Sequence, residues 1–118
     1  MNLLKVLMPM HAALADGGGG CDALQQLQNR IEAFQRRKFP KQPADAKLAH
    51  CHREITELRA DPNDISEWAD VLILFLGAAA CQCISSEDLI RAAHAKMDVN
   101  ECRKWGEPDG EGVCRHID

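Results

Sequence analysis

The 118-residue sequence has no tyrosine, only three phenylalanines and two tryptophans, and no apolar run long enough to span a bilayer. So few large aromatic side chains give a small domain few core anchors, and we therefore expect a surface that associates with further copies. Basic runs are also scarce, because none is longer than Arg36, Arg37 and Lys38, and the formal net charge is −4. This excludes a duplex-DNA binder held by phosphate contacts. We expect neither a nucleic acid nor a membrane as a partner.

What is present is the composition of one small globular domain, with 46% hydrophobic and 27% charged residues. Four consecutive glycines, residues 17–20, separate the first residues from the rest. We expect residues 1–20 to be a flexible or weakly ordered N-terminal segment and residues 21–118 to form the domain.

Six cysteines stand at positions 21, 51, 81, 83, 102 and 114, an even number that would fit three disulfides in a secreted protein. Ala13, Leu14 and Ala15 would also suit a signal peptidase, but Lys5 follows two leucines and Pro9 interrupts the apolar run. The spacing of Cys81 and Cys83 differs from that of zinc knuckles and redox helices. We therefore expect reduced thiols and a cytoplasmic location, in the host cytoplasm if the chain is viral, with secretion as the alternative.

Four stretches have the spacing of amphipathic helices, and none has the alternation of a strand hairpin or a βαβ unit. Proline, Asp and Ser residues stand at the ends of these stretches, where they cap or terminate helices. The predicted helices run from Asp22 to before Pro40, from Pro43 or Asp45 to Asp61, from Ile65 to about Cys81, and from Ser85 or Ser86 to near Trp105. The links are short, so the sequence predicts an all-α fold, an antiparallel bundle of four main helices that is completed by oligomerisation.

Two of these helices carry a clear prediction about burial. The second has an apolar stripe of Leu48, Cys51, Ile55 and Leu58, which we expect to face the core. The third is apolar on every side between residues 71 and 80, and a helix of this kind is expected to be buried all round.

Two acidic pairs flank the turn between the second and third helices. Glu54 and Glu57 lie three residues apart, as do Glu67 and Asp70, so each pair shares one helix face. If the two helices form an antiparallel hairpin, both pairs lie near its turn and the four carboxylates can share one site.

Buried carboxylates are normally protonated, paired with bases or bound to a metal. Oxygen ligands without cysteine or histidine at a matching spacing favour Mg²⁺ or Mn²⁺ over zinc. Simpler interpretations remain open: Asp64 and Glu67 also fit a capping box, and Glu57 could be a solvated surface residue. A di-iron carboxylate bundle is disfavoured, because no histidine stands three residues after a glutamate.

A polar stripe on the fourth helix is the second candidate for chemistry. Lys96, Asn100 and Arg103 fall at i, i+4 and i+7, and Trp105 follows. Two cations and an amide on one face can clamp a phosphate when they lie opposite a metal site. The same stripe is also ordinary helix surface, and Trp105 fits stacking on a base and anchoring of the C-terminal turn equally well.

The order of these motifs resembles the MazG-like superfamily of all-α nucleoside triphosphate pyrophosphohydrolases, most closely its short phage and bacterial dATP/dGTP diphosphohydrolase group. The resemblance covers roughly residues 24 to 117 and includes His50 before the first acidic pair, the turn of residues 61–64, the glycine-rich turn of residues 110–112, and His116 with Ile117. One departure is Arg53, which stands before Glu54 where many relatives have a further acidic residue.

The resemblance implies roles for the motif residues. The metal ligands would be Glu54, Glu57, Glu67 and Asp70, with Glu54 or Glu57 as the catalytic residue that orients or deprotonates the attacking water. Lys96 and Arg103 would contact phosphates, and Asn100 phosphate or sugar. Substrate contacts are also expected from Trp105 and from Gln28 of the first helix.

The implied function is Mg²⁺-dependent hydrolysis of nucleoside triphosphates, purine deoxynucleotides such as dGTP and dATP first, to the monophosphate and pyrophosphate. Two or more Mg²⁺ ions are expected, with Mn²⁺ able to substitute, and the enzyme would act as a homodimer or homotetramer. The alternative is a non-enzymatic helical interaction module or a metal-binding regulator.

Overall fold

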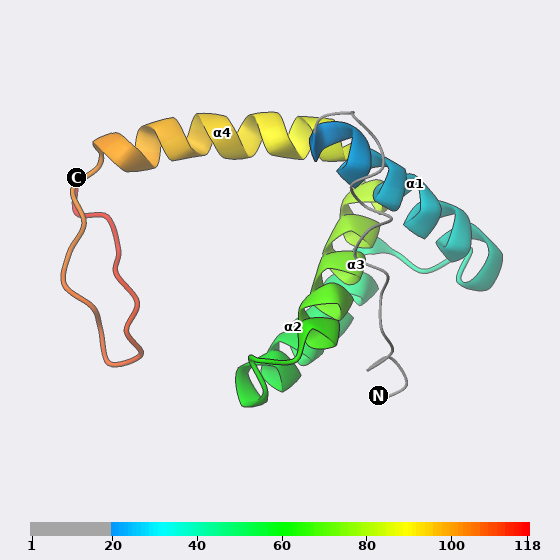
Figure 1. Cartoon of the computed structure of the whole chain (residues 1–118), viewed down its shortest axis with the longest axis horizontal. Coiled ribbons are helices and arrows are strands. Elements are labelled where there is room, and N and C mark those ends of the chain that lie inside the picture. Colours follow the sequence, from blue (N-terminus) through cyan, green and yellow to red (C-terminus); the bar gives the residue numbers. More distant parts are fainter. Residues whose placement is uncertain (1–19) are drawn as a thin grey trace. The chain divides into compact units, whose positions relative to one another are not determined.

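The computed structural model describes residues 20–118, and the N-terminal segment predicted at residues 1–20 lies outside this part except for its last residue. The described part holds four helices and one isolated β-bridge but no strand, which confirms the all-α prediction (Figure 1). The helices are α1 (Gly20–Lys38), α2 (Ala44–Ala60), α3 (Ile65–Cys81) and α4 (Ser86–Cys102). The chain divides into two compact units, one up to Glu87 and one of Asp88–Asp118.

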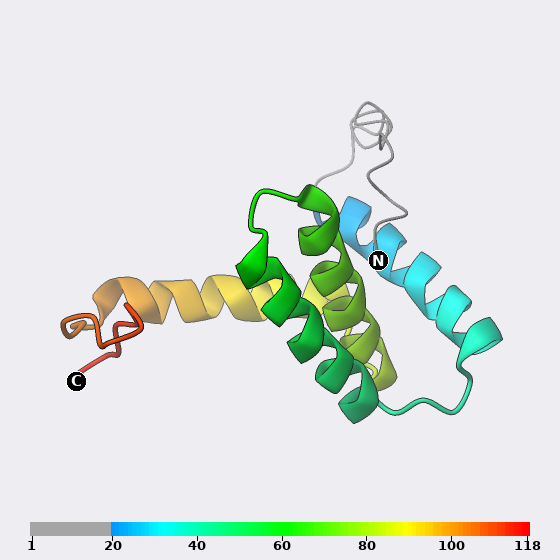
Figure 2. The same cartoon turned by 90° about the horizontal axis from the view of Figure 1, so that it is seen from below.

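Helices α2 and α3 form an antiparallel hairpin, in which they lie side by side along their length (Figures 1 and 2). The turn between them follows from its residues: Pro62 cannot continue α2, and Asp64 caps α3 because its side chain accepts a 3.0 Å hydrogen bond from the Ser66 backbone N–H. Trp68 Nε1 also donates to the Pro62 carbonyl at 2.9 Å. The hairpin expected from the sequence is therefore confirmed, and of the two candidate caps, Asn63 and Asp64, it is Asp64 that caps α3.

Helix α1 is joined to α3 by two buried glutamines. Gln28 Nε2 donates to the carbonyls of Leu76, at 3.2 Å, and Ile84, at 2.9 Å. The Gln28 Oε1 atom accepts from the Ser86 backbone N–H at 2.7 Å. Gln35 Nε2 donates to the Gly77 carbonyl at 3.3 Å. A Cβ at Gly77 would lie 2.0 Å from Gln35 Oε1, so a larger residue at this position would displace the Gln35 amide.

The buried face of α2 differs from the predicted stripe. Cys51 is buried as expected, but Leu48 and Ile55 are 47% and 41% exposed. The face toward the core is instead formed by Ala44, Lys47, Cys51 and Glu54. The apolar spacing pointed to the wrong side because two charged side chains occupy the buried positions of this helix.

The expectation that α3 is buried all round between residues 71 and 80 is wrong for the single chain. Leu76, Gly77 and Ala78 are buried, whereas Leu72, Ile73 and Phe75 are 40%, 41% and 48% exposed. The reason is geometric: α1 and α2 cover only part of the circumference of α3.

In the second unit, α4 ends at Cys102 and is followed by a C-terminal loop. Trp105 and His116 form the isolated β-bridge, and their rings meet edge to face with centroids 6.1 Å apart. Hydrogen bonds from Gly106 N to Arg115 O and from Ile117 N to Lys104 O, 2.8 and 2.9 Å long, close the loop on both sides of this bridge. Along α4, Leu89 and Ile90 are half-buried, whereas Met97 is 49% exposed.

The five cysteines with described side chains are free thiols, and only Cys51 among them is buried. Cys21 lies outside the described side chains, and the reduced state of the thiols stays a prediction. Within residues 20–118 no single helix has the length and apolarity of a membrane span; α3 and α4 pass that test only as a bent pair.

Candidate metal centre

The α2–α3 hairpin brings the predicted acidic residues together. Glu54 lies in the second half of α2, and Glu67 and Asp70 lie in the first turns of α3, so both contributions come from the turn end of the hairpin. One carboxylate oxygen from each of Glu54, Glu67 and Asp70 lies within 4.8 Å of the other two. The spacing of the acidic pairs therefore predicted the approach of three of the four side chains, Glu54, Glu67 and Asp70.

Two oxygen atoms of this cluster are buried without a partner. Glu54 and Glu67 are 4% and 9% exposed, and the Oε2 atom of each has no hydrogen-bond donor among the described residues. A buried carboxylate oxygen without a donor is costly unless it is protonated or binds a cation. The backbone N–H of Asp64, from which Glu67 would accept in a capping box, donates to the Asp61 carbonyl at 3.3 Å.

Glu57 lies at the exposed edge of the cluster. It is not one of the three residues whose oxygens lie within 4.8 Å of one another. Its carboxylate is still close enough to raise the pKa of Glu54, Glu67 and Asp70. Glu57 therefore adds negative charge to the site from its open side.

Burial and mutual repulsion dominate the electrostatics. The pKa of Glu54 rises to about 7, first because the side chain is buried and then through hydrogen bonding with Glu57 and the charges of Glu57, Asp70 and Glu67. The pKa values of Glu67 and Asp70 are raised as well, again by burial first and by Glu57 second. Without a counter-charge, this group of carboxylates resists full ionisation.

The nearest basic group is His50, one turn before Glu54 on α2. Its Nε2 atom lies 3.2 Å from Glu54 Oε1. In the described part of the chain, no lysine or arginine forms an ion pair with any of the four acidic residues, Arg53 and Arg59 included. No arginine or lysine therefore neutralises the negative charge of the cluster. A divalent cation can supply the missing positive charge.

The polar stripe of Lys96, Asn100 and Arg103 belongs to the second unit. Lys96 is exposed, Asn100 is half-buried near the end of α4, and Arg103 is half-buried one residue beyond the helix. Trp105 donates from Nε1 to the Asn100 carbonyl at 3.0 Å. With its bridge to His116, this bond supports the interpretation of Trp105 as an anchor of the C-terminal loop.

Gln28 is 3% exposed, and its amide is already used within the chain. Both N–H groups of an amide can donate, and those of Gln28 go to the Leu76 and Ile84 carbonyls. The hydrogen bonds thus give Gln28 a structural role, and substrate contact by this residue is not supported by them.

Sequence reasoning missed Lys47, a lysine that is only 4% exposed. A signal was present, because Lys47, Cys51 and Glu54 follow one another at i, i+4 and i+7, the spacing of a single helix face. Among charged residues this spacing usually marks a solvated face.

Comparisons with known proteins agree with this geometry. A family model described as dATP/dGTP pyrophosphohydrolase matches residues 27–118. The dATP/dGTP diphosphohydrolase of cyanophage S-2L is 35% identical over 94 residues, which are 78% of this chain and 86% of that protein. The Eaa protein of Salmonella phage P22 is 45% identical over 53 residues, 44% of this chain but only 17% of the Eaa protein.

A solved structure, the cyanophage S-2L MazG-like pyrophosphohydrolase bound to dGDP and three catalytic Mn²⁺ ions per active site, superposes with a TM-score of 0.69 at 34% identity. The match covers 80% of this chain and 97% of that chain. The chain therefore belongs to the dATP/dGTP pyrophosphohydrolase family of MazG-like enzymes, hydrolases that act on nucleotide pyrophosphate bonds.

Proposed function

We propose that this protein hydrolyses purine deoxynucleoside triphosphates, dGTP and dATP, to the monophosphate and pyrophosphate with the help of Mg²⁺. The observation that carries the proposal is the convergence of Glu54, Glu67 and Asp70, with two buried oxygens that lack a donor. The names of the cyanophage relatives, a dATP/dGTP diphosphohydrolase and a pyrophosphohydrolase bound to dGDP, support the choice of substrate.

The donor set fits divalent cations. Glu54, Glu67 and Asp70 would hold the ions, and Glu57 would join them from the exposed edge. Carboxylate oxygens suit the hard cations Mg²⁺ and Mn²⁺, and the cyanophage structure contains three Mn²⁺ ions per active site, so two or more ions are expected here. When bound, such ions neutralise phosphate charge and lower the pKa of a water molecule.

Residues of this chain would take up the proton of the attacking water and orient the carboxylate that accepts it. Glu54 or Glu57 accepts a proton from the attacking water, whose oxygen forms a bond to the α-phosphorus. The bond from the α-phosphorus to the bridging oxygen breaks, and pyrophosphate leaves with that oxygen. His50 fixes the Glu54 carboxylate through the 3.2 Å contact to Oε1.

Substrate contacts are proposed for the polar stripe of the second unit. Lys96 and Arg103 would bind phosphate oxygens, because ammonium and guanidinium groups form charge-assisted hydrogen bonds with them. Asn100 would contact phosphate or sugar. Trp105 would support this stripe through its bond to the Asn100 carbonyl.

We also propose a homodimer or homotetramer in which a second copy covers the exposed apolar side of α3. Leu72, Ile73 and Phe75 are each at least 40% exposed, although they lie on the most apolar helix. Light scattering coupled to size-exclusion chromatography tests this, and a monomer at micromolar concentration would contradict it.

The function is tested by incubating the purified full chain with each common nucleoside triphosphate and Mg²⁺ or Mn²⁺, with detection of monophosphate and pyrophosphate. We expect dGTP and dATP each to give monophosphate and pyrophosphate in equal amounts. No product is expected after the divalent ions are chelated. Release of inorganic phosphate in place of pyrophosphate, or no product with any nucleotide, would reject the proposal. A protein without turnover would be a helical interaction module.

A further inference from the structure

A cavity of about 470 Å³ lies between the end of α1, the linker of residues 39–43, the start of α2 and the end of α3. All residues that line it belong to the first compact unit. Its volume falls in the range of small-molecule sites. It therefore has the size to hold a ligand of its own.

The cavity is closed off from the carboxylate cluster, and none of the four acidic residues lines it. On the buried face of α2, Cys51 follows Lys47 by one turn, is 5% exposed, and donates from Sγ to the Val71 carbonyl at 3.7 Å. On the side of α1, the Gln35 Oε1 atom packs against Gly77. A molecule in this cavity would therefore lie outside the proposed metal centre.

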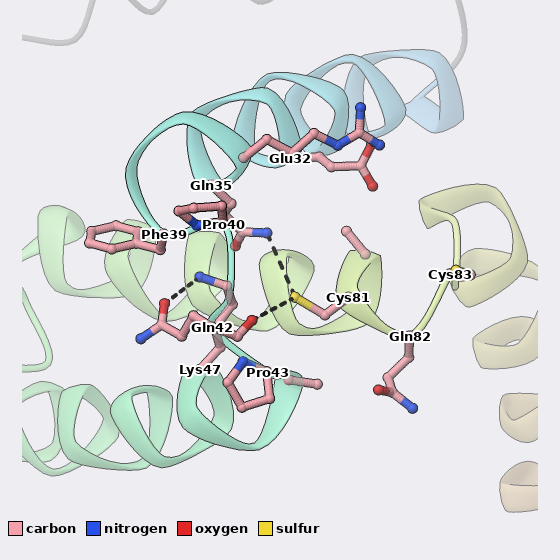
Figure 3. Close-up of a pocket in the computed structure, with 13 residues that line it drawn as sticks. Glu32, Gln35, Phe39, Pro40, Gln42, Pro43, Lys47, Cys81, Gln82 and Cys83 are labelled. Atoms are coloured by element: carbon pink, nitrogen blue, oxygen red, sulfur yellow. Dashed lines mark hydrogen bonds and ion pairs between the residues drawn. The ribbon is translucent and has the colours of Figure 1, made fainter.

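Lys47 brings into this cavity a positive charge that no carboxylate neutralises. The residue is 4% exposed, and lysine is almost never buried to this extent without an ionic partner. Within residues 20–118 it forms no ion pair: its Nζ atom donates to Gln42 Oε1 at 2.8 Å and lies 5.4 Å from the centre of the Phe39 ring (Figure 3). Both partners are neutral, and an ammonium group has three N–H donors, so donors and the charge remain for a ligand.

The other two charged residues that line the cavity neutralise each other. Arg36 Nη2 lies 2.9 Å from Glu32 Oε1 on the side of α1, where the Arg36 side chain is 76% exposed. The cavity wall thus keeps the positive charge of Lys47, although the chain as a whole has a net charge of −4. Such a local charge favours an anion.

The linker adds an apolar wall beside this charge. Phe39 lines the cavity together with Pro40 and Pro43, and its ring is 48% exposed. The ring meets that of Phe34 edge to face, with centroids 5.9 Å apart. A flat apolar group laid against Phe39 would remove exposed apolar area from water.

We propose that this cavity binds a small organic anion, with an oxyanion group at Lys47, either carboxylate or phosphate monoester, and a flat apolar body against Phe39. An oxyanion forms stronger, charge-assisted hydrogen bonds with an ammonium group than the neutral Gln42 amide does. The ligand needs no divalent ion, because the cavity supplies its own cation. The site is therefore independent of the proposed hydrolysis, and each can fail without the other.

Thermal melts of the full chain in the presence of a chelator give the first test, because no metal ion can then hold an anion at the carboxylates. The probes are phenyl phosphate and benzoate, which carry an oxyanion on a flat ring, and benzamide, which has the ring without the charge. A ringed anion at 100 times its Kd should raise Tm by several degrees, and benzamide should not. Both anions support the proposal, and the larger shift identifies the preferred oxyanion. No shift with either anion, or an equal shift with benzamide, would overturn the proposal.

Variants locate the anion, with calorimetry of the better ringed anion as the measurement. Lys47→Met keeps an unbranched side chain but removes the charge, so Kd should rise about tenfold or more, whereas Lys47→Arg should retain binding. Lys41→Gln, at an exposed lysine of the linker, is the matched control and should leave Kd unchanged. Lys96→Ala tests binding at the polar stripe of α4. An unchanged Kd in Lys47→Met, or a loss of binding in Lys96→Ala, would overturn the assignment to this cavity.

Cys81 gives a measurement on the wild-type chain. This exposed thiol lines the cavity, where its Sγ atom donates to the Gln42 carbonyl at 3.8 Å and accepts from Gln35 Nε2 at 4.0 Å (Figure 3). With the anion at ten times its Kd, alkylation of Cys81 by iodoacetamide should slow about fivefold or more, because about nine-tenths of the sites are occupied. Cys102 and Cys114, exposed thiols of the second unit, are internal controls and should react at unchanged rates. Equal alkylation of Cys81 with and without the anion would overturn the proposal.

Discussion

His50 Nε2 lies 3.2 Å from Glu54 Oε1, while the other oxygen of the same carboxylate, Oε2, is buried without any hydrogen-bond donor in the described part of the chain. One oxygen is thereby fixed and the other is left for the cluster with Glu67 and Asp70. Hydrogen bonds to the outer side of a carboxylate orient it toward a metal and are a regular feature of metal sites. The histidine thus holds one oxygen of the Glu54 carboxylate and leaves the other for the cluster.

Divalent cations should stabilise the folded protein. A ligand at 100 times its dissociation constant adds about 2.7 kcal/mol when it binds only the native state, which is several degrees in Tm for a chain of this size. Thermal melts of the full chain with and without Mn²⁺ or Mg²⁺ measure the shift. Na⁺ at matched ionic strength controls for screening, and a Tm that moves with neither Mn²⁺ nor Mg²⁺ would exclude the carboxylate cluster as a metal centre.

Replacing one acidic ligand should abolish most of the activity without lowering the stability of the metal-free protein. Glu54→Gln and Asp70→Asn keep the side-chain shape but remove one negative charge, so the metal-free protein should be as stable as the wild type or a few degrees more stable. Hydrolysis should fall by more than about 100-fold, because even residues that only support metal ligands cost 10–100-fold when changed.

Activity assays and melts of the same preparations provide the check. Glu87→Gln, at an exposed glutamate outside the cluster, is the matched control and should behave as the wild type. Wild-type turnover by either Glu54→Gln or Asp70→Asn would refute the assigned roles.

The metal-free protein should lose stability as the pH rises. Glu54 has a pKa of about 7 in the folded chain against an ordinary value of 4.5, and the pKa values of Glu67 and Asp70 are raised too. Between these two values the unfolded chain has released a proton that the folded chain still binds, so the free energy of unfolding falls with increasing pH. Melts between pH 5 and pH 8 in the presence of a chelator measure this slope.

Two comparisons test whether the pH dependence of stability comes from the carboxylate cluster. Glu54→Gln should flatten the slope, because its amide does not titrate. Saturating Mn²⁺ should reverse the slope, since the ion binds ionised carboxylates and its affinity falls as they are protonated. A metal-free wild type that gains stability from pH 5.5 to pH 8 would contradict the coupling between the carboxylates.

Local sequence signals defined the helices and the acidic site well. Proline at positions 40 and 62 and aspartate at position 64 fix helix ends by their own chemistry, and the spacing of the acidic pairs fixes their shared face. The buried state of Lys47 and the exposure of Leu48 depend on long-range packing, of which the crossing of α1 over α3 is one part. That crossing is set by long-range contacts of Gln28 and Gln35, polar residues that helix periodicity assigns to solvent.

Gln28 should therefore matter for stability. Gln28→Ala removes hydrogen bonds to the Leu76 and Ile84 carbonyls and leaves the backbone N–H of Ser86, a fully buried residue, without its acceptor. At about 1 kcal/mol for each bond, with a further penalty for buried groups left unpaired, the loss should be about 2–4 kcal/mol. Denaturant unfolding measures it, and Arg30→Ala, at an exposed arginine on the same helix, should change stability by less than about 0.5 kcal/mol.

Lys96 should act on substrate binding and leave the fold unchanged. It is exposed on α4, so Lys96→Ala should leave the melting temperature nearly unchanged. If its ammonium binds the triphosphate, KM for dGTP should rise about 5–20-fold, because a charged hydrogen bond contributes about 1.5–3 kcal/mol when it is partly shielded from water and less when it is exposed. The rise should shrink at high salt, which screens the wild-type contact. Lys104→Ala, a neighbouring exposed lysine, is the matched control, and an unchanged KM in Lys96→Ala would remove this residue from the phosphate site.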